Sequence, residues 1–293
     1  MRQSAEVMVR RDDGASITFS SDLRDPVRLN HGATGLGIAP VQFDTEAVLA
    51  GHGSVLRGSR LTERDILVPL MLEAASTAAL DAVREDLMRL VSPLDPSPLW
   101  LRVTAPESGT YREMQVHYAG GLDGDFGSSY WGRAQKVALE FKALGALWAG
   151  EPEVLTKRVK PAVQHFLSTT QPFFPVRLSS ALVSGTLDVT VTGDAPTAPM
   201  WSITPPGEEL MIKRPDTGER FYLAGRMTKP LEIDMAEGRV EDTAGSDLWE
   251  RVSLDSRLFE LPPGPTRLEF SMVNATEASA VTVTYRPQYL AAL

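Results

Sequence analysis

Short stretches in which apolar and polar residues alternate recur along the chain and predict β-strands. The first two, Val7–Val9 and Ile17–Phe19, flank the sequence Asp12-Asp13-Gly14, a composition typical of a hairpin turn. Further strands are expected at residues 66–72, 99–104, 114–118 and 136–142. Because Pro69 has no amide hydrogen, we expect its strand to lie at a sheet edge or to contain a bulge.

One segment repeats with the period of a helix. Its apolar positions fall three, four and three residues apart, at Leu80, Val83, Leu87 and Leu90. Ser76 stands where a residue that caps the helix N-terminus is needed, and Pro93 follows the end of the pattern. The sequence therefore predicts one amphipathic helix with its apolar face packed on a sheet.

The composition changes near Gly150. Residues 151–175 include four prolines, and the chain beyond them alternates short strand-like runs with turn sequences such as Pro215–Gly218 and Glu237-Gly238. We expect an N-terminal domain at 1–150, a connection at 151–175 that a protease cuts first, and a β-sandwich domain at 176–293.

Composition and charge exclude several classes of protein. Apolar residues make up 43% of the 293 residues and charged residues 23%, as in ordinary globular proteins. Residues 1–150 carry 15 Lys and Arg against 19 Asp and Glu, and the remainder 14 against 19, so clustered cations for specific nucleic-acid binding are not expected. We expect no membrane span and no secretory signal. The absence of cysteine is compatible with the expected synthesis in a reducing cytoplasm.

Few residues could carry catalysis or hold a metal ion. The chain has no cysteine, and its histidines, His31, His52, His117 and His165, form no helical metal-binding pair. Asp123 and Asp125 could serve acid–base chemistry or bind Ca²⁺, but they stand among glycines with no accompanying base or nucleophile. We interpret this pair as part of a turn and predict no catalytic residue, no cofactor and no metal ion.

Two of the five tryptophans are candidates for a carbohydrate site. An exposed indole face can stack on the apolar face of a sugar ring, and Trp201 and Trp249 both lie in the C-terminal half. Burial in the core is the alternative for each of them.

The C-terminal half resembles the siphophage distal tail proteins. The order and spacing of five segments carry this resemblance: Leu231–Asp234, Arg239-Val240, Leu258–Gly264, Arg267–Phe270 and Tyr285–Tyr289. In the N-terminal half, Gly35-Leu36-Gly37, the run Arg60–Leu72, the single helix and the strand near Leu99 are similar to the belt domain of the same family.

The resemblance implies a mainly β fold of the β-rich α+β class. A belt-type β-sandwich with one packed helix would close with five further copies into a hexameric ring, and a galectin-like β-sandwich would face outward. The implied function is structural: a minor tail protein, the hub that connects the tail tube to the tail tip or baseplate and its host-recognition proteins. Its implied partners are the tail tube protein, a tail-associated tip protein and the tape measure protein, at the distal end of the virion tail.

Two other functions remain open. A carbohydrate- or receptor-binding component of the tail tip would use Trp201 and Trp249. A glycosidase or peptidoglycan hydrolase would depend on Asp123 and Asp125 alone.

Overall fold

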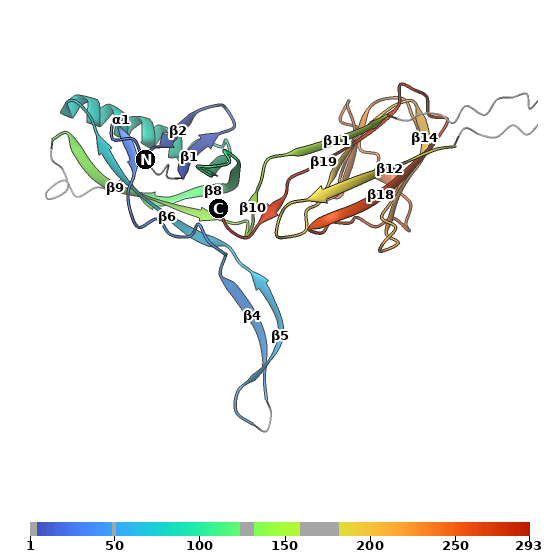
Figure 1. The fold of residues 1–293 in the computed structure, drawn as a ribbon, viewed down its shortest axis with the longest axis horizontal. Coiled ribbons are helices and arrows are strands. Elements are labelled where there is room, and N and C mark those ends of the chain that lie inside the picture. Colours follow the sequence, from blue (N-terminus) through green and yellow to red (C-terminus); the bar gives the residue numbers. More distant parts are fainter. Residues whose placement is uncertain (1–4, 49–50, 124–131, 159–181) are drawn as a thin grey trace, which may run out of the picture. The chain divides into compact units, whose positions relative to one another are not determined.

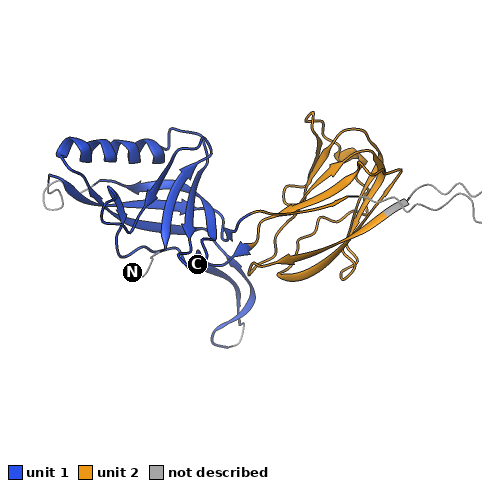
Figure 2. Ribbon diagram, turned by 45° about the horizontal axis from the view of Figure 1, so that its top comes forward, with its two compact units in different colours: residues 1–151, 288–293 blue, residues 152–287 orange. Residues whose placement is uncertain are grey.

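The computed structural model describes residues 5–48, 51–123, 132–158 and 182–293 (Figure 1). Over these residues the protein is mainly β with one α-helix, α1 (Thr77–Val91), which confirms the expected fold class. The chain forms two compact units: unit 1 is Met1–Glu151 together with Gln288–Leu293, and unit 2 is Pro152–Pro287 (Figure 2). Unit 2 is therefore inserted in the sequence of unit 1, and the chain passes between them twice.

Unit 1 is built on one sheet whose strands follow the order β2-β1-β7-β8-β9-β6-β3. The end strands also meet, because the Ser20 amide donates to the Val27 carbonyl at 3.2 Å and the Leu29 amide donates to the Ser20 carbonyl at 3.0 Å. The strands of this sheet are β1 (Glu6–Arg11), β2 (Ser16–Phe19), β3 (Val27–Leu29), β6 (Arg64–Glu73), β7 (Leu99–Thr104), β8 (Tyr111–Gly121), β9 (Ala134–Ala143), β10 (Trp148–Ala149) and β20 (Gln288–Tyr289).

Alternation along the strands produces the core of unit 1. In β6, Val68, Leu70 and Leu72 are fully buried, and α1 adds Leu80 and Leu87 from the other side. Burying one such leucine stabilises a fold by roughly 2 kcal/mol relative to leaving it exposed. The helix begins as expected, because the Ser76 hydroxyl accepts a hydrogen bond of 3.2 Å from the Ala79 amide.

The position expected for Pro69 was wrong. Its strand, β6, lies inside the sheet between β9 and β3, and Pro69 pairs with Ala138 without a bulge. Proline fits there because β3 ends at Leu29, beside Leu70, so Pro69 lies just beyond the ladder. Its carbonyl still accepts from the Asn30 amide at 2.8 Å, and only one hydrogen bond is lost.

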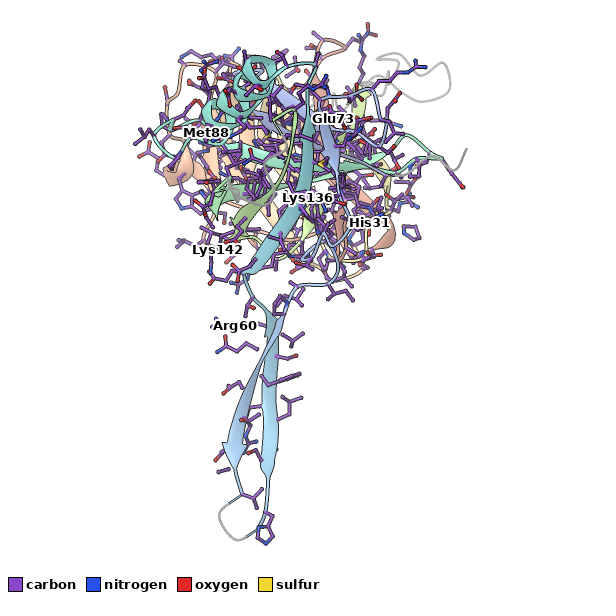
Figure 3. The ribbon with its side chains drawn as sticks, turned by 90° about the vertical axis from the view of Figure 1, so that its left-hand side faces the viewer. His31, Arg60, Glu73, Met88, Lys136 and Lys142 are labelled. Carbon is purple, nitrogen blue, oxygen red and sulfur yellow. The ribbon has the colours of Figure 1, made fainter. Side chains whose placement is uncertain are left out.

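Two further strands of unit 1 leave this body as a hairpin, which we call the arm (Figures 1 and 3). It consists of β4 (Val41–Ala47) and β5 (Ser54–Leu61), which pair only with each other. The sequence analysis did not predict it.

Unit 2 is a sandwich of two antiparallel sheets around its own apolar core. The first sheet has the order β11-β19-β13-β16-β17 and the second β12-β18-β14-β15, and the turns expected at Pro215–Gly218 and Glu237-Gly238 join adjacent strands. The elements are β11 (Glu153–Arg158), β12 (Leu182–Val191), β13 (Met200–Thr204), β14 (Gly207–Lys213), β15 (Arg220–Met227), β16 (Leu231–Asp234), β17 (Arg239–Asp242), the 3₁₀ turn η1 (Trp249–Arg251), β18 (Gly264–Val273) and β19 (Ala280–Tyr285).

The division of the chain differs from the expected domains in two places. Glu153–Arg158 is not part of a connection: it forms β11, an edge strand of unit 2. Its charged composition resembles that of a linker because only one of its edges is paired and most of its side chains are exposed. The end of the chain, Gln288–Leu293, returns to unit 1. Residues 159–175 lie outside the described part of the chain.

The turn that follows β17 is organised by a carboxylate. Asp242 accepts hydrogen bonds from the amides of Ser246 at 3.0 Å and Ala244 at 2.8 Å, and an ion pair of 3.1 Å from Lys229 Nζ. These donors, the Ser246 amide above all, lower the pKa of Asp242 from 3.8 to about 2.

We predict an acid-sensitive contribution of Asp242 to stability. Because its pKa is lower in the folded chain than in the unfolded one, the ionised group stabilises the fold above about pH 4, and this contribution disappears as the pH falls toward about 2. Asp242→Asn should remove this part of the pH dependence of the free energy of unfolding, measured by urea titration between pH 2 and 6. Asp255→Asn, at an exposed position, is the control, and equal pH profiles for both variants would contradict the assignment.

The inserted arrangement predicts that a chain cleaved once between residues 159 and 181 stays together. The N-terminal fragment would retain β11, which pairs with β19 from Glu153 to Arg158, and the C-terminal fragment would retain β20, which pairs with β10. With a specific protease site engineered there, size-exclusion chromatography should show one species and a denaturing gel two. Two separate native peaks would show that this pairing does not hold the fragments.

Candidate assembly surface

The arm presents large apolar side chains outside the core. Phe43 on β4 is 62% exposed and Leu56 on β5 is 58% exposed, and Val41 is also exposed. A two-stranded hairpin by itself is only marginally stable in water. Exposed apolar side chains gathered on one segment are typical of an interaction surface.

Cross-strand pairing assigns the side chains of the arm to two faces. Val41, Phe43 and Thr45 alternate with the polar residues between them, and Thr45 pairs with Leu56 across the hairpin. We call the side of Val41, Phe43 and Leu56 the apolar face. Burying these three side chains against another surface would stabilise the contact by roughly 1 kcal/mol each, because about half of each is exposed.

The other side is the polar face of the arm. Arg60 donates from Nε and Nη2 to Gln42 Oε1 at 3.0 and 2.8 Å, and Arg57 Nε donates to Glu46 Oε2 at 2.7 Å. Val55, which pairs with Glu46, also lies here. Side chains that satisfy one another in this way suit a face turned toward water, so the arm is amphipathic.

A buried arginine holds the root of the arm, by which we mean Gly35–Pro40 and Thr62–Arg64. Arg64 donates to the carbonyls of Gly35, Gly37 and Ala146, and burial lowers the pKa of its guanidinium below its ordinary value. Gly35 has a φ of +81°, and a Cβ there would lie 2.2 Å from the Asp65 carbonyl oxygen. Only glycine allows this close approach of the two backbone segments.

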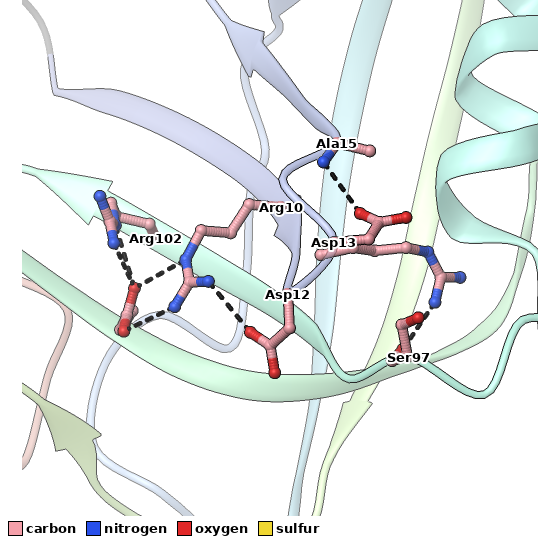
Figure 4. Close-up of polar contacts among 8 residues, drawn as sticks. Arg10, Asp12, Asp13, Ala15, Ser97 and Arg102 are labelled. Carbon is pink, nitrogen blue, oxygen red and sulfur yellow. Dashed lines mark hydrogen bonds and ion pairs between the residues drawn. The ribbon is translucent and has the colours of Figure 1, made fainter.

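A second polar cluster lies on the face of the main sheet away from the core (Figure 4). Glu113 is buried, and it accepts from Arg10 at 3.0 and 3.2 Å and from Arg102 at 2.8 and 3.0 Å. Arg10 lies over the ring of Trp100 and Arg102 over that of Tyr111, at 5.3 and 3.7 Å from the centroids. The cluster ties β1, β7 and β8 together, and its hydrogen bonds to Glu113 raise the pKa of Arg10.

The candidate residues for chemistry are not brought together. Asp123 is exposed, while Asp125 and His165 lie outside the described residues. Among the described residues there is no group of three or more His, Asp or Glu that could hold a metal ion. No helix in that part of the chain is long and apolar enough to cross a membrane.

The two tryptophans proposed for a carbohydrate site have different surroundings. Trp201 on β13 is fully buried in the core of unit 2, so its ring cannot stack on a ligand. Trp249 in η1 is 42% exposed. A platform that uses both rings is excluded, and Trp249 alone stays a candidate.

Sequence reasoning missed Val41, Phe43 and Leu56. The signal was present in the alternation from Val41 to Thr45 and in the Gly51-His52-Gly53 sequence that separates β4 from β5. It was hidden because half of the intervening residues are polar, as expected of a hairpin with no core beneath it.

Comparison with known proteins identifies structures that share this fold. Residues 192–289 match the family model described as siphovirus-type tail component, C-terminal domain. The chain superimposes on the Dit (gp 19.1) protein of SPP1, described as a paradigm of the hub adsorption apparatus in phages that infect Gram-positive bacteria. That match has a TM-score of 0.65 at 15% identity and covers 96% of this chain and 98% of that chain.

A chain of the phage P2 baseplate, in its activated conformation with Ca, is also similar. The TM-score is 0.52 at 10% identity, and the match covers 94% of this chain and 99% of that chain. No curated protein matches the sequence. At these identities the two structures show a shared fold.

We predict that the Glu113 cluster contributes measurably to stability. Glu113→Ala would remove the buried carboxylate that Arg10 and Arg102 share, so the free energy of unfolding should fall by about 2 kcal/mol in denaturant titration. The control is Glu46→Ala, which removes an exposed ion pair of the arm and should change stability by less than about 0.5 kcal/mol. Equal losses in the two variants would contradict the role of the cluster.

Proposed function

We propose, from the family match at residues 192–289 and from the shared fold, that this chain is a siphophage distal tail protein and forms the hexameric hub at the distal end of the tail. Unit 1 would form the ring and unit 2 would extend from it. This hub would join the tail tube to the tail tip or baseplate and to the host-recognition proteins. The role is one of assembly, without catalysis.

The amphipathic arm is the observation that carries this proposal. The main sheet of unit 1 leaves little free edge, because β2 and β3 meet each other, whereas β4 and β5 pair only with each other. The outer edges of the arm therefore offer backbone N–H and C=O groups to a neighbour. Its apolar face offers Val41, Phe43 and Leu56.

The arm is also compatible with a ring. It projects from one side of unit 1 (Figure 3), so an arm that docks on the body of a second copy makes a contact between two different surfaces. Repeated contacts of this kind close into a ring when the rotation between copies divides a full turn, and otherwise give a filament. Six copies is the number that the resemblance to distal tail proteins implies.

A hub at the distal end of the tail would bind proteins on both of its sides. The tail tube protein would bind one side of the ring, and a tail-associated tip protein and the tape measure protein would bind the other side or its centre. Unit 2, the galectin-like sandwich, would face the host-recognition proteins. The acidic balance of residues 1–150 suits an opening that does not grip DNA.

One observation favours a second candidate function, carbohydrate or receptor binding by unit 2. Trp249 is half exposed, and its Cη2 lies 3.9 Å from the point where a side chain at Gly238 would begin. Leu258 Cδ1 lies 3.2 Å from the same point and lines an open pocket of about 470 Å³ with Arg214 and Glu219. Trp249 thus lies near Leu258, which lines the pocket, and an exposed indole can stack on the apolar face of a sugar ring.

The hub proposal predicts that the apolar face of the arm is required for assembly. Phe43→Glu places a charge on that face and should prevent formation of the six-copy ring, seen by native mass spectrometry and by electron microscopy at high protein concentration with the tail tube protein. Gln42→Glu, the matched control, adds the same charge one residue away on the polar face, next to Arg60, and should still assemble.

Two results would contradict the hub proposal. One is equal assembly by both variants. The other is an image of the tail tip in which this protein forms isolated peripheral copies instead of a continuous collar around the tube.

The second candidate is tested separately on a glycan array with the full chain and its Trp249→Ala variant. Binding by the parent that the variant loses would support a carbohydrate site at Trp249. Absence of binding by the parent would remove this candidate and leave the hub proposal unaffected.

A further inference from the structure

The end of the chain lies against the root of the arm, and we propose that Gln288–Leu293 act as a latch that fixes the direction of the arm. These residues return to unit 1 after the whole of unit 2. They reach the root from β20 and bind Leu36, in the segment that leads into β4.

The latch is first anchored through β20. Tyr289 pairs with Trp148 and Gln288 with Ala149 of β10. Trp148 is fully buried, and the guanidinium of Arg64 lies 5.9 Å from the centroid of its ring. The strand that receives the latch is thus packed on the arginine that holds the arm.

Two further contacts place the last residues. The Ala292 amide donates to the Leu36 carbonyl at 2.8 Å, and the Ala292 side chain is buried in the core of unit 1. Arg112 Nη1 donates to the Ala291 carbonyl at 2.9 Å, and its guanidinium lies 3.8 Å from the centroid of the Tyr289 ring. The latch is thus bound to β8 through Arg112 and is bound to the loop before the arm through Leu36.

Leu36 is the central residue of the loop that Arg64 binds. The Arg64 guanidinium donates to the carbonyls of Gly35 and Gly37, on both sides of Leu36. Three consecutive carbonyls are therefore fixed, two by Arg64 and one by the latch. Four residues later the Pro40 carbonyl accepts from the Thr62 amide at 2.9 Å, and β4 begins at Val41.

This arrangement matters because a hairpin without a core beneath it takes its direction only from its root. Fixing that direction in advance reduces the ordering cost of binding a neighbour. This last step rests on the proposed ring. The direction of the arm can be measured on the unassembled protein. Failure of the latch can therefore be told apart from failure of the ring.

The absence of cysteine allows the direction of the arm to be measured with two spin labels. Labels at Ser54→Cys on the arm and Leu94→Cys on the body, both exposed positions, report the distribution of distances between them. The test compares a chain that ends at Leu290, an Arg112→Gln variant, and a control that lacks only the exposed Leu293. Hydrogen exchange of residues 33–42 is followed in the same dilute samples.

The latch predicts one narrow distance distribution for the parent and the Leu293 control, and a broadened one for the shortened chain and for Arg112→Gln. Exchange of residues 33–42 should become about fivefold faster in those two variants, as expected for a lost hydrogen bond, while β12 and β18 of unit 2 do not change. Unchanged distributions in both variants would overturn the proposal. A second result would also overturn it: the distance distribution broadens only in the shortened chain, that chain is unfolded throughout unit 1, and Arg112→Gln behaves like the parent.

Discussion

The need to satisfy backbone hydrogen bonds shapes the whole of unit 1. A sheet with two open edges would offer pairing sites at both ends, but Ser20 and its partners bring β2 and β3 together and remove most of that opportunity. The free edges are concentrated instead in β4 and β5, away from the body. One constraint thus accounts both for the near closure of the main sheet and for the unpaired outer edges of the arm.

Arginine side chains hold the irregular parts of the structure to this sheet. Arg11 donates to the carbonyls of Leu90, Ser92 and Ser97 and so holds the segment that follows α1. Arg64 does the same for the root of the arm. In unit 2, Arg251 donates to the carbonyls of Ala224 and Arg226. A guanidinium carries several donors in one plane, so a single side chain can satisfy carbonyls from separate turns.

Much of this fold could be predicted from the sequence, because local signals agree with the tertiary structure. The period of Leu80 to Leu90, the Ser76 cap and the turn sequences of unit 2 each depend on residues close together in the chain. The insertion of unit 2 could not be predicted, since the pairing of β20 with β10 joins residues about 140 positions apart. The arm was missed for a related reason: without a core beneath it, its alternation is incomplete. The candidate site was the least predictable part, because the burial of Trp201 and the exposure of Trp249 depend on how whole sheets pack.

The discontinuous path of the chain has a consequence for timing during synthesis. Residues 1–151 leave the ribosome first, but the body of unit 1 lacks β20 and the buried Ala292 until all of unit 2 has been translated. Translation proceeds from the N-terminus at a finite rate, so unit 2 can fold while its host unit is still incomplete. The part of unit 1 that borders the root of the arm is therefore complete only after unit 2 has been translated.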